Sequence, residues 1–503
     1  MYFPSKKEFI RLSKKANVIP VYRELLCDLL TPVLSFKRLK GDYSYLLESI
    51  EGEEKIARYS FIGIDPLVIF KSKNNYVELI TQDGKTRRFF TDSPLKELQN
   101  IMSNFRLAGI EGLPRFCGGF VGFMGYDTVR FFEELPDNNP DKLDVEDCIF
   151  IMPHIQVIFD HSTHRIKIML NVHTGNVSVK ELGLISGNKD AGKLYDAALK
   201  KIEDIIKRLN APSKDDGLKR PRRFLPHRVE SNFTKDEFTS IVKKAKDYIK
   251  SGDIIQVVLS QRFRTELYCD PFDVYRALRS INPSPYMYYL NFDRLKLIGA
   301  SPEMLVRCEN GIVETRPIAG TRPRGSNESE DRKLEKELLM DPKEKAEHVM
   351  LVDLGRNDIG RVCSSGTVKV TDFMKIEHYS HVMHIVSNCV GRLAKGKTSY
   401  DALKACFPAG TVTGAPKIRA MEIIDELENT KRGPYAGAVG YFSFSGNMDT
   451  CINIRSILVK DKEAFIQSGA GIVADSLPDR EYKETLNKAK AMLRAIELAE
   501  NGL

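Results

Sequence analysis

Tryptophan is absent from the 503 residues, and so are the usual sequence marks of export and membrane insertion. The start, MYFPSKKEFI, has no apolar segment of the kind that signal peptides carry, and no run of about 18 apolar residues occurs. The nine cysteines form no CxxC pair and no regular framework, as is typical of small core residues in a reducing compartment. We therefore expect a cytoplasmic protein without a membrane span.

A concentrated basic surface is also missing. The net charge is +8, but acidic residues are interleaved with basic ones almost everywhere. The one basic cluster, 219–228, lies in a proline-rich stretch that is more typical of a linker than of a surface tracking phosphates. The charge favours a small anionic substrate over nucleic acid.

The pattern of apolar and turn residues predicts an α+β protein with an N-terminal block and a C-terminal block. Residues 1–30 are expected to be helical, and 193–209 has the apolar spacing of an amphipathic helix. Short runs typical of β-strands lie between them, at 43–50, 59–72, 76–81, 150–161 and 164–172. We expect an N-terminal domain over 1–209, a linker over 210–228 and a second domain over 229–503.

The second domain opens on a capping box, in which Thr234 and Glu237 satisfy the free amides at a helix start. That helix is expected to run to Lys250. Strands are predicted at 254–263, 295–301 and 303–317, and helices begin again at 328–340. The segments 118-GGFVGF-123 and 437-GAVGYF-442 resemble each other and hint at related β elements in the two blocks.

Two pairs of glutamates have the spacing that places both carboxylates on one face of a helix. Glu344 and Glu347 are three residues apart, Glu481 and Glu484 repeat that spacing, and Lys488 follows one turn later. Four carboxylates from two helices can hold a hard divalent ion such as Mg²⁺. Glutamates at this spacing also decorate many solvated helices, so the spacing alone assigns no metal.

Three other patterns carry weaker chemical signals. His378, His381 and His384 lie at intervals of three, which is no standard zinc signature, so a proton-transfer role for one of them is the better interpretation. The run 410-GTVTGAPK-417 lacks the glycine and the Ser/Thr of a phosphate loop. Gly469 and Gly471 would let backbone amides approach a carboxylate if they followed a strand.

Taken together, these segments resemble the chorismate-utilising enzymes, and among them the family of anthranilate synthase large subunits. The resemblance covers almost all of 232–503 in family order. It is carried by GDIIQVVLSQRF (252–263), NPSPYMYY (282–289), GASPEMLVR (299–307), RPIAGTRPRG (316–325), AEHVMLVDLGRND (346–358), YSHVMHIVS (379–387), GAPKIRAMEII (414–424), GAVGYF, DTCINIRS (449–456), GAGIV (469–473) and ETLNKA (484–489). In the N-terminal half the similar segments are LLES (46–49), ARYSFIG (57–63) and GGFVGFMGYD (118–127).

The resemblance implies a large fold of mainly antiparallel β-sheets packed face to face with helices outside. It implies a Mg²⁺-dependent amination of chorismate followed by loss of pyruvate to give anthranilate. Mg²⁺ would be bound through Glu344, Glu347, Glu481 and Glu484 and would act as Lewis acid and template.

The resemblance also assigns residues to the substrate. The pyruvyl carboxylate would meet Arg455, Tyr435 and the backbone of 469–471, which comprises Gly469, Ala470 and Gly471. Gly320 and Thr321 would line the ring, with Lys488 also in the substrate site. His384 matches the catalytic histidine of the family, placed for proton transfer, and Thr321 and Gln256 join it as catalytic candidates.

Two positions discriminate among family members. Aminodeoxychorismate synthases usually carry a nucleophilic lysine where Ala319 stands, and relatives that use water carry a lysine base where Gln256 stands. Alanine cannot act as a nucleophile and an amide cannot act as a base, which favours free ammonia as the group that attacks the substrate. The chain has no Gly-x-Cys-x-Gly turn, so the family implies a separate glutamine amidotransferase subunit that supplies ammonia, in a heterotetramer of two large and two small subunits.

Feedback control by L-tryptophan is the second implied function. LLES and NPSPYM resemble the inhibitor-binding elements of the family. They place an effector site at Glu48, Ser49, Arg58, Pro285, Tyr286, Met287, Gly440 and Cys451. Glu48 would take the ammonium group of the ligand, and Tyr286 and Met287 would form an apolar wall for indole.

Three alternatives remain open from the sequence. An aminodeoxychorismate synthase component I would share the fold and the metal but form another product. A tryptophan sensor without turnover would have no need of the four glutamates and His384. A nucleic-acid binder would show salt-dependent affinity for DNA.

Overall fold

A computed structural model describes residues 1–49, 58–174, 190–211, 228–379 and 382–502. The predicted linker 210–228 lies mostly outside these ranges, so the division of the chain there stays a prediction. The described helices, including two short 3-10 helices η1 and η3, are α1 (Lys6–Leu12), α2 (Pro32–Leu39), α3 (Pro94–Ser103), η1 (Tyr126–Phe131), α4 (Ala191–Asn210), α5 (Lys235–Ser251), α6 (Pro271–Ile281), α7 (Glu328–Met340), α8 (Pro342–Gly360), α9 (Ser399–Cys406), η3 (Gly410–Val412), α10 (Lys417–Leu427) and α11 (Pro478–Asn501).

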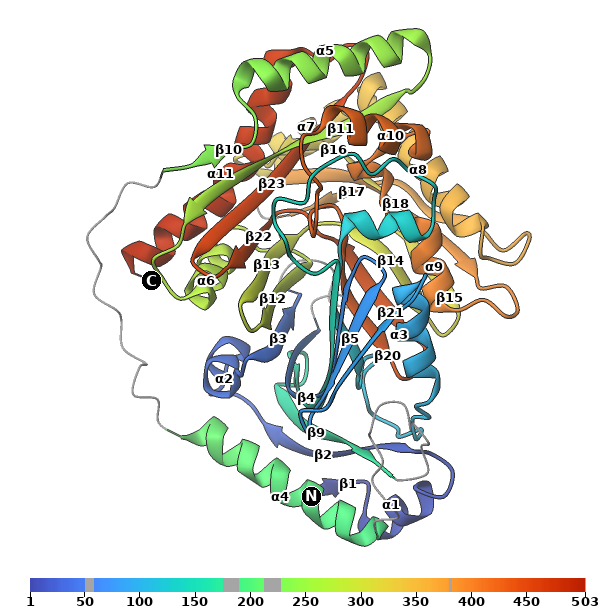
Figure 1. Cartoon of the computed structure of the whole chain (residues 1–503), viewed down its shortest axis with the longest axis vertical. Coiled ribbons are helices and arrows are strands. Elements are labelled where there is room, and N and C mark those ends of the chain that lie inside the picture. Colours follow the sequence, from blue (N-terminus) through green and yellow to red (C-terminus); the bar gives the residue numbers. More distant parts are fainter. Residues whose placement is uncertain (50–57, 175–189, 212–227, 380–381, 503) are drawn as a thin grey trace.

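The strands form one connected antiparallel network, and Figure 1 shows it running from the top of the molecule to the bottom. The strands of the first half are β1 (Tyr2–Phe3), β2 (Val18–Leu26), β3 (Tyr43–Glu48), β4 (Tyr59–Lys73), β5 (Tyr76–Thr81), β6 (Thr86–Phe90), β7 (Gly119–Met124), β8 (Cys148–Asp160) and β9 (Arg165–His173). Those of the second half are β10 (Glu230–Ser231), β11 (Gln256–Glu266), β12 (Tyr286–Phe292), β13 (Leu295–Ser301), β14 (Met304–Glu309), β15 (Ile312–Thr315), β16 (Ile318–Pro323), β17 (Lys369–His378), β18 (Val382–Arg392), β19 (Gly414–Ala415), β20 (Ala438–Ser443), β21 (Met448–Ile452), β22 (Ser456–Lys460) and β23 (Glu463–Ile472).

Strands of the two halves pair directly with each other. β3 pairs with β12, with Glu48 opposite Met287. β7 pairs with β20, with Gly122 opposite Gly440, so the two similar segments noted in the sequence are neighbouring strands. Added Cβ atoms at these glycines would meet backbone atoms at 1.9 and 2.1 Å, and glycine is therefore required for the close approach.

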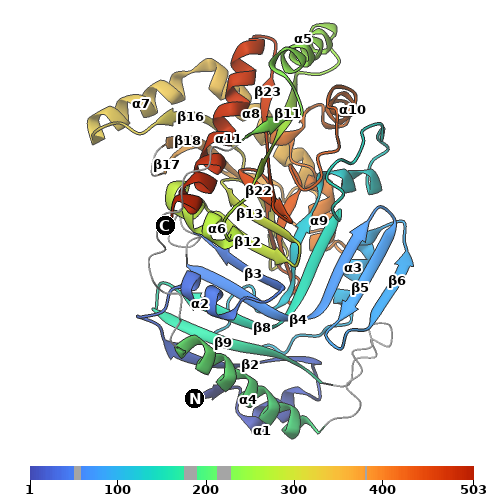
Figure 2. The ribbon, with the colours of Figure 1, turned by 60° about the vertical axis from the view of Figure 1, so that its left-hand side comes forward.

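Helices cover the outside of this network, as the α+β prediction expects. Figure 2 shows α4 lying across β2 and β9 at the lower end, and α11 running down beside α6. The apolar faces of these helices bury Ile202 and Ile205 of α4 and Ala495 and Ile496 of α11. No described helix combines the length and apolar character needed to cross a membrane.

Two local predictions are wrong. Residues 1–30 are not helical throughout, because 18-VIPVYRELL-26 is rich in β-branched residues and pairs as β2 with β9. The predicted strand 303–317 is a hairpin of β14 and β15, which turns at Asn310 and Gly311 with φ of 51° and 77°. The capping box of Thr234 and Glu237 is confirmed at the start of α5.

Candidate active site

A cavity of about 390 Å³ opens between β11, β23, α8 and α11. Nine residues singled out in the sequence line it: Gln256, Glu347, Tyr435, Arg455, Gly469, Gly471, Glu481, Glu484 and Lys488. Ala470 is fully buried in the apolar core on the other face of β23, since alternate residues of a strand face opposite sides.

Two helices bring the glutamates to this cavity. The carboxylate of Asp341 caps α8 by accepting hydrogen bonds from the amides of Lys343 and Glu344, at 3.0 and 3.3 Å. Glu347 lies one turn further along α8. Glu481 and Glu484 occupy the first two turns of α11, as the helical spacing predicts.

The carboxylates perturb one another. Burial and then the neighbouring charge of Glu344 raise the pKa of Glu347, to which Glu484 also contributes. Burial raises the pKa of Glu481, and the charge of Glu484 adds to the effect. Since Glu484 of α11 contributes to the raised pKa of Glu347 on α8, the two helices place these carboxylates close enough to interact electrostatically.

Cations within the chain already contact two of the four glutamates. Arg322 Nη1 donates to Glu344 Oε1 at 3.1 Å, and Lys488 Nζ lies 2.7 Å from Glu484 Oε1. Among the residues that the structure describes, no three His, Cys, Asp or Glu side chains stand in a ready metal-binding arrangement. Each of these ion pairs uses one oxygen of its glutamate, Oε1 in both cases.

Cationic side chains line the cavity beside these glutamates. Lys488 Nζ donates to the carbonyl of Gly469 at 2.9 Å, and Arg455 Nη1 donates to the carbonyl of Lys488 at 3.1 Å. Burial lowers the pKa of Arg455. Its backbone has a φ of 54°, which is costly for a residue with a side chain and is often found at functional sites.

His384 lies on β18 opposite Thr321 of β16. Its Nδ1 is 3.0 Å from the carbonyl oxygen of Gly320, to which it donates, so Nε2 is the ring nitrogen left for proton transfer. Gly320 bulges from β16 with a φ of 70°, and a Cβ there would stand 3.2 Å from Glu344 Oε2. Gly320 thus contacts His384 through its carbonyl and leaves room for the carboxylate of Glu344. None of Gly320, Thr321, Glu344 and His384 is among the residues that line the cavity. Burial lowers the pKa of His384.

The other two histidines of that segment are not brought to the site by any described contact. His378 Nε2 lies 2.8 Å from Glu335 Oε1, and His381 falls outside the described residues.

Gly469 and Gly471 lie inside β23 and pair with β11 rather than following the strand, and their contact with a substrate carboxylate stays a prediction. Their lack of a Cβ has another consequence. A Cβ on Gly471 would stand 2.6 Å from Gln256 Nε2, and one on Gly469 would stand 2.9 Å from the hydroxyl of Tyr435. The two glycines make room for these side chains.

Glu303 lines the cavity and was not singled out from the sequence. Burial raises its pKa to about 7. Its signal was present in GASPEMLVR (299–307), where a carboxylate directly precedes a buried strand. A carboxyl group with a pKa near neutrality in a cavity is suited to acid–base chemistry.

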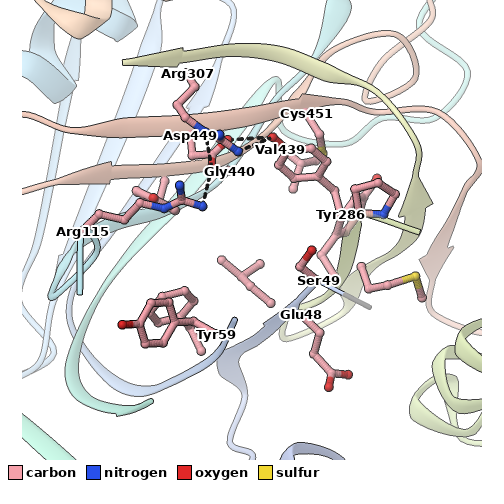
Figure 3. A pocket seen from close by; sticks show the side chains of 16 residues that line it. Glu48, Ser49, Tyr59, Arg115, Tyr286, Arg307, Val439, Gly440, Asp449 and Cys451 are labelled. Carbon is pink, nitrogen blue, oxygen red and sulfur yellow. Dashed lines mark hydrogen bonds and ion pairs between the residues drawn. The ribbon is translucent and has the colours of Figure 1, made fainter. Parts of the chain in front are cut away.

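A second cavity, of about 70 Å³, lies where β3, β12, β20 and β21 meet, and Figure 3 shows the side chains around it. Seven of the eight predicted effector residues line it: Glu48, Ser49, Pro285, Tyr286, Met287, Gly440 and Cys451. The eighth, Arg58, does not line it and instead forms an ion pair with Asp160, at 2.8 Å. The segments LLES and NPSPYM therefore do meet in space.

The charged groups of this second cavity were not all anticipated. Asp449 accepts from Arg307 Nε at 3.0 Å and from the hydroxyl of Tyr286 at 2.9 Å, and Arg115 Nη2 lies 3.4 Å away (Figure 3). Glu48 is 5% exposed, and α6 supplies hydrogen-bond donors to its carboxylate, including Arg279 Nε at 3.1 Å. Arg307 and Asp449 stood in quoted segments, but only long-range pairing of β14 with β21 joins them.

Comparisons with known proteins agree with this geometry. The family profile of chorismate binding enzymes matches residues 43–494. Anthranilate synthase component 1 of Aquifex aeolicus is 50% identical over 99% of this chain and 98% of its own length, and that of Acetivibrio thermocellus is 49% identical over 99% of both. The crystal structure of anthranilate synthase component I from Streptococcus pneumoniae superposes with a TM-score of 0.76 at 38% identity, covering 93% of this chain and 98% of that chain. The chain belongs to the chorismate binding enzymes and, within them, to the anthranilate synthase component 1 family.

Proposed function

We propose that this chain aminates chorismate with ammonia and eliminates pyruvate, so that chorismate and NH₃ give anthranilate, pyruvate and water. One observation carries the proposal: Glu347, Glu481 and Glu484 from two helices line the same cavity as Arg455 and Lys488. The name component 1 of the relatives supports a second subunit. We take this subunit to be a glutamine amidotransferase that releases ammonia, in an assembly with two copies of each subunit, as the family resemblance implies.

The charges of the cavity support a divalent cation. Glu347, Glu481 and Glu484 line it beside three cationic side chains, those of Lys343, Arg455 and Lys488. A substrate with two carboxylates would therefore bring uncompensated negative charge unless a further cation is bound. Glu344, Glu347, Glu481 and Glu484 offer the oxygen ligands that Mg²⁺ prefers, and burial followed by the charges of neighbouring carboxylates raises the pKa of Glu347. When bound, Mg²⁺ would supply Lewis-acid polarisation of substrate oxygens.

Arg455 and Lys488 would hold the other end of the substrate. Arg455 offers a planar fork that suits a carboxylate, and Lys488 offers a single charge beside it. Tyr435 is buried between the cavity and Arg432, with its ring centroid 5.7 Å from that guanidinium carbon, and this packing fixes its hydroxyl near Gly469.

Two groups are suited to moving protons. Glu303, with a pKa near 7, is able to protonate the hydroxyl that leaves C4 of chorismate as ammonia attacks the ring. Nε2 of His384 is able to accept the ring proton lost as pyruvate departs. The nucleophile must come from outside, since Ala319 and the amide of Gln256 provide none.

The second cavity would bind L-tryptophan as a feedback inhibitor. Tyr286 and Met287 provide apolar surface. Arg115 and Arg307, which pair with Asp449 and also with Glu309 and Glu314 respectively, are the cationic side chains of the cavity that a ligand carboxylate would contact. Since β21 runs from this cavity through Ile452 toward Arg455, an occupied effector site has a short route to the substrate cavity.

One assay tests the proposal. The purified chain is incubated with chorismate, an ammonium salt and Mg²⁺ at high pH, with or without L-tryptophan, and anthranilate is followed by its fluorescence. Anthranilate formation that requires Mg²⁺ and falls with tryptophan supports the amination, the metal dependence and the feedback inhibition. An aminated product that fluoresces only after a lyase is added would replace the proposal with an aminodeoxychorismate synthase.

A further inference from the structure

A third cavity, of about 50 Å³, adjoins the substrate cavity. Residues of α8, η3 and the strands β14 and β15 line it. Only Glu303 and Thr411 line both cavities, so these two side chains separate one space from the other. The third cavity is much smaller than the substrate cavity of about 390 Å³, so it suits a smaller molecule than chorismate.

Two hydroxyl groups face this space with unused hydrogen-bonding capacity. Thr315 is 5% exposed, and neither its Oγ1 nor that of Thr411 makes a hydrogen bond of normal geometry to any residue that the structure describes. Thr315 lies close enough to the thiol of Cys389, and Thr411 to the carboxyl group of Glu303, to lower the pKa of each of those groups against the larger effect of burial. Buried hydroxyls without partners are uncommon and indicate a small polar guest.

A glycine inside α8 keeps the space open. Gly355 lies in the middle of the helix, where alanine would be more favourable, and a Cβ there would stand 3.1 Å from Thr315 Oγ1. Because Gly355 has no Cβ, free space remains beside the hydroxyl of Thr315.

The other charged side chains that line the cavity each form an ion pair with a residue of opposite charge. Asp358 is paired with Lys417 at 2.8 Å, and Arg316 is paired with Glu377. With Glu303 protonated the space is neutral, which suits an uncharged guest better than a metal cation.

We propose that this third cavity binds ammonia beside Glu303 and Thr411 before it enters the substrate cavity. The proposal rests on the function proposed above, which requires ammonia. Ammonia has three N–H donors and one lone pair. The hydroxyl of Thr315 can donate to the lone pair, while oxygen atoms of Thr411 and Glu303 can accept from its N–H groups.

Two variants test the proposal without disturbing the substrate cavity. Gly355→Ala fills the space and favours the helix, and Thr315→Val removes the hydroxyl while keeping the side-chain shape. The matched control is Gly360→Ala at the end of the same helix, where an added Cβ meets no atom within 4 Å. The purified chain is assayed for anthranilate with chorismate, Mg²⁺ and varied ammonium at constant pH and ionic strength.

We expect each test variant to raise the KM for ammonium about fivefold, the effect of one hydrogen bond, with the KM for chorismate unchanged. Gly360→Ala should behave as the parent. An unchanged ammonium KM in both variants, indicating that only water occupies the cavity, would overturn the proposal, as would an equal rise in the chorismate KM. If one variant unfolds at a lower temperature, the other decides. Failure of the parent chain to form anthranilate would instead refute the proposed function.

Discussion

Glu428 and Arg432 form an ion pair that is almost completely buried, with Arg432 Nη2 2.6 Å from Glu428 Oε1 and Nε 3.0 Å from Oε2. The same guanidinium donates to the carbonyls of Val258 and Val412, each at 2.7 Å. Both valines line the substrate cavity, one from β11 and one from η3. A single buried cation therefore holds two walls of the cavity at a fixed spacing.

Replacing Arg432 by methionine should strongly destabilise the protein. The change leaves Glu428 buried without its charge partner, which costs about 3–5 kcal/mol of unfolding free energy. A lower midpoint of urea unfolding would show this. Arg332→Met serves as control, because its i,i+4 pair with Glu328 is exposed at the surface and should be worth less than about 1 kcal/mol. Equal midpoints for both variants would contradict the prediction.

Loss of a carboxylate at the proposed metal site should weaken Mg²⁺ binding. We expect Glu347→Gln and Glu484→Gln each to reduce Mg²⁺ affinity at least about tenfold, measured by calorimetry, and to reduce anthranilate formation in parallel. Chelation with EDTA should abolish turnover of the parent chain, and added Mg²⁺ should restore it. Asp353→Asn, on an exposed turn of α8, should change neither property. Unaltered Mg²⁺ affinity in both glutamine variants would exclude these residues as ligands.

The helices that carry the site could be predicted from local pattern alone. The i,i+3 spacing of Glu344 with Glu347 and of Glu481 with Glu484 correctly indicated helical faces, because periodicity is a local property. The meeting of the two helices at one cavity depends on contacts between residues far apart in the sequence. It followed only from the resemblance of the segments to a known family.

Other features depended on tertiary contacts that leave no local mark. Glu303 looks like an ordinary residue before a strand, and its raised pKa arises from burial by distant segments. Arg58 was assigned to the effector site by alignment across a segment of variable length, and the structure pairs it with Asp160 instead. The strand at 18–26 was missed because its β-branched residues follow a stretch with helical spacing.

Glu303 should make the stability of the metal-free protein depend on pH. Its pKa is about 7 in the folded protein against an ordinary value of 4.5, so the folded state holds the proton more tightly. The stabilisation is fully present below pH 4.5 and is lost as the pH rises through about 7, a change on the order of 3 kcal/mol at most. Glu303→Gln should flatten this part of the profile of unfolding free energy against pH.

The control for this profile is Glu497→Gln, on the outer face of α11, which should leave the slope as it is. Measurements are made without Mg²⁺, so that metal binding does not add its own pH dependence. A slope that persists in Glu303→Gln would assign the titration to another group.

Ser49 should contribute directly to tryptophan binding. Its hydroxyl lines the effector cavity, is buried, and has no hydrogen-bond partner among the described residues. Ser49→Ala should therefore leave folding intact and weaken tryptophan binding by about five- to tenfold, the value of one hydrogen bond. Because the chain contains no tryptophan, the fluorescence of the bound ligand can be read without indole emission from the protein. Ser103→Ala, at the exposed end of α3, is the control, and equal affinities for the two variants would place the ligand elsewhere.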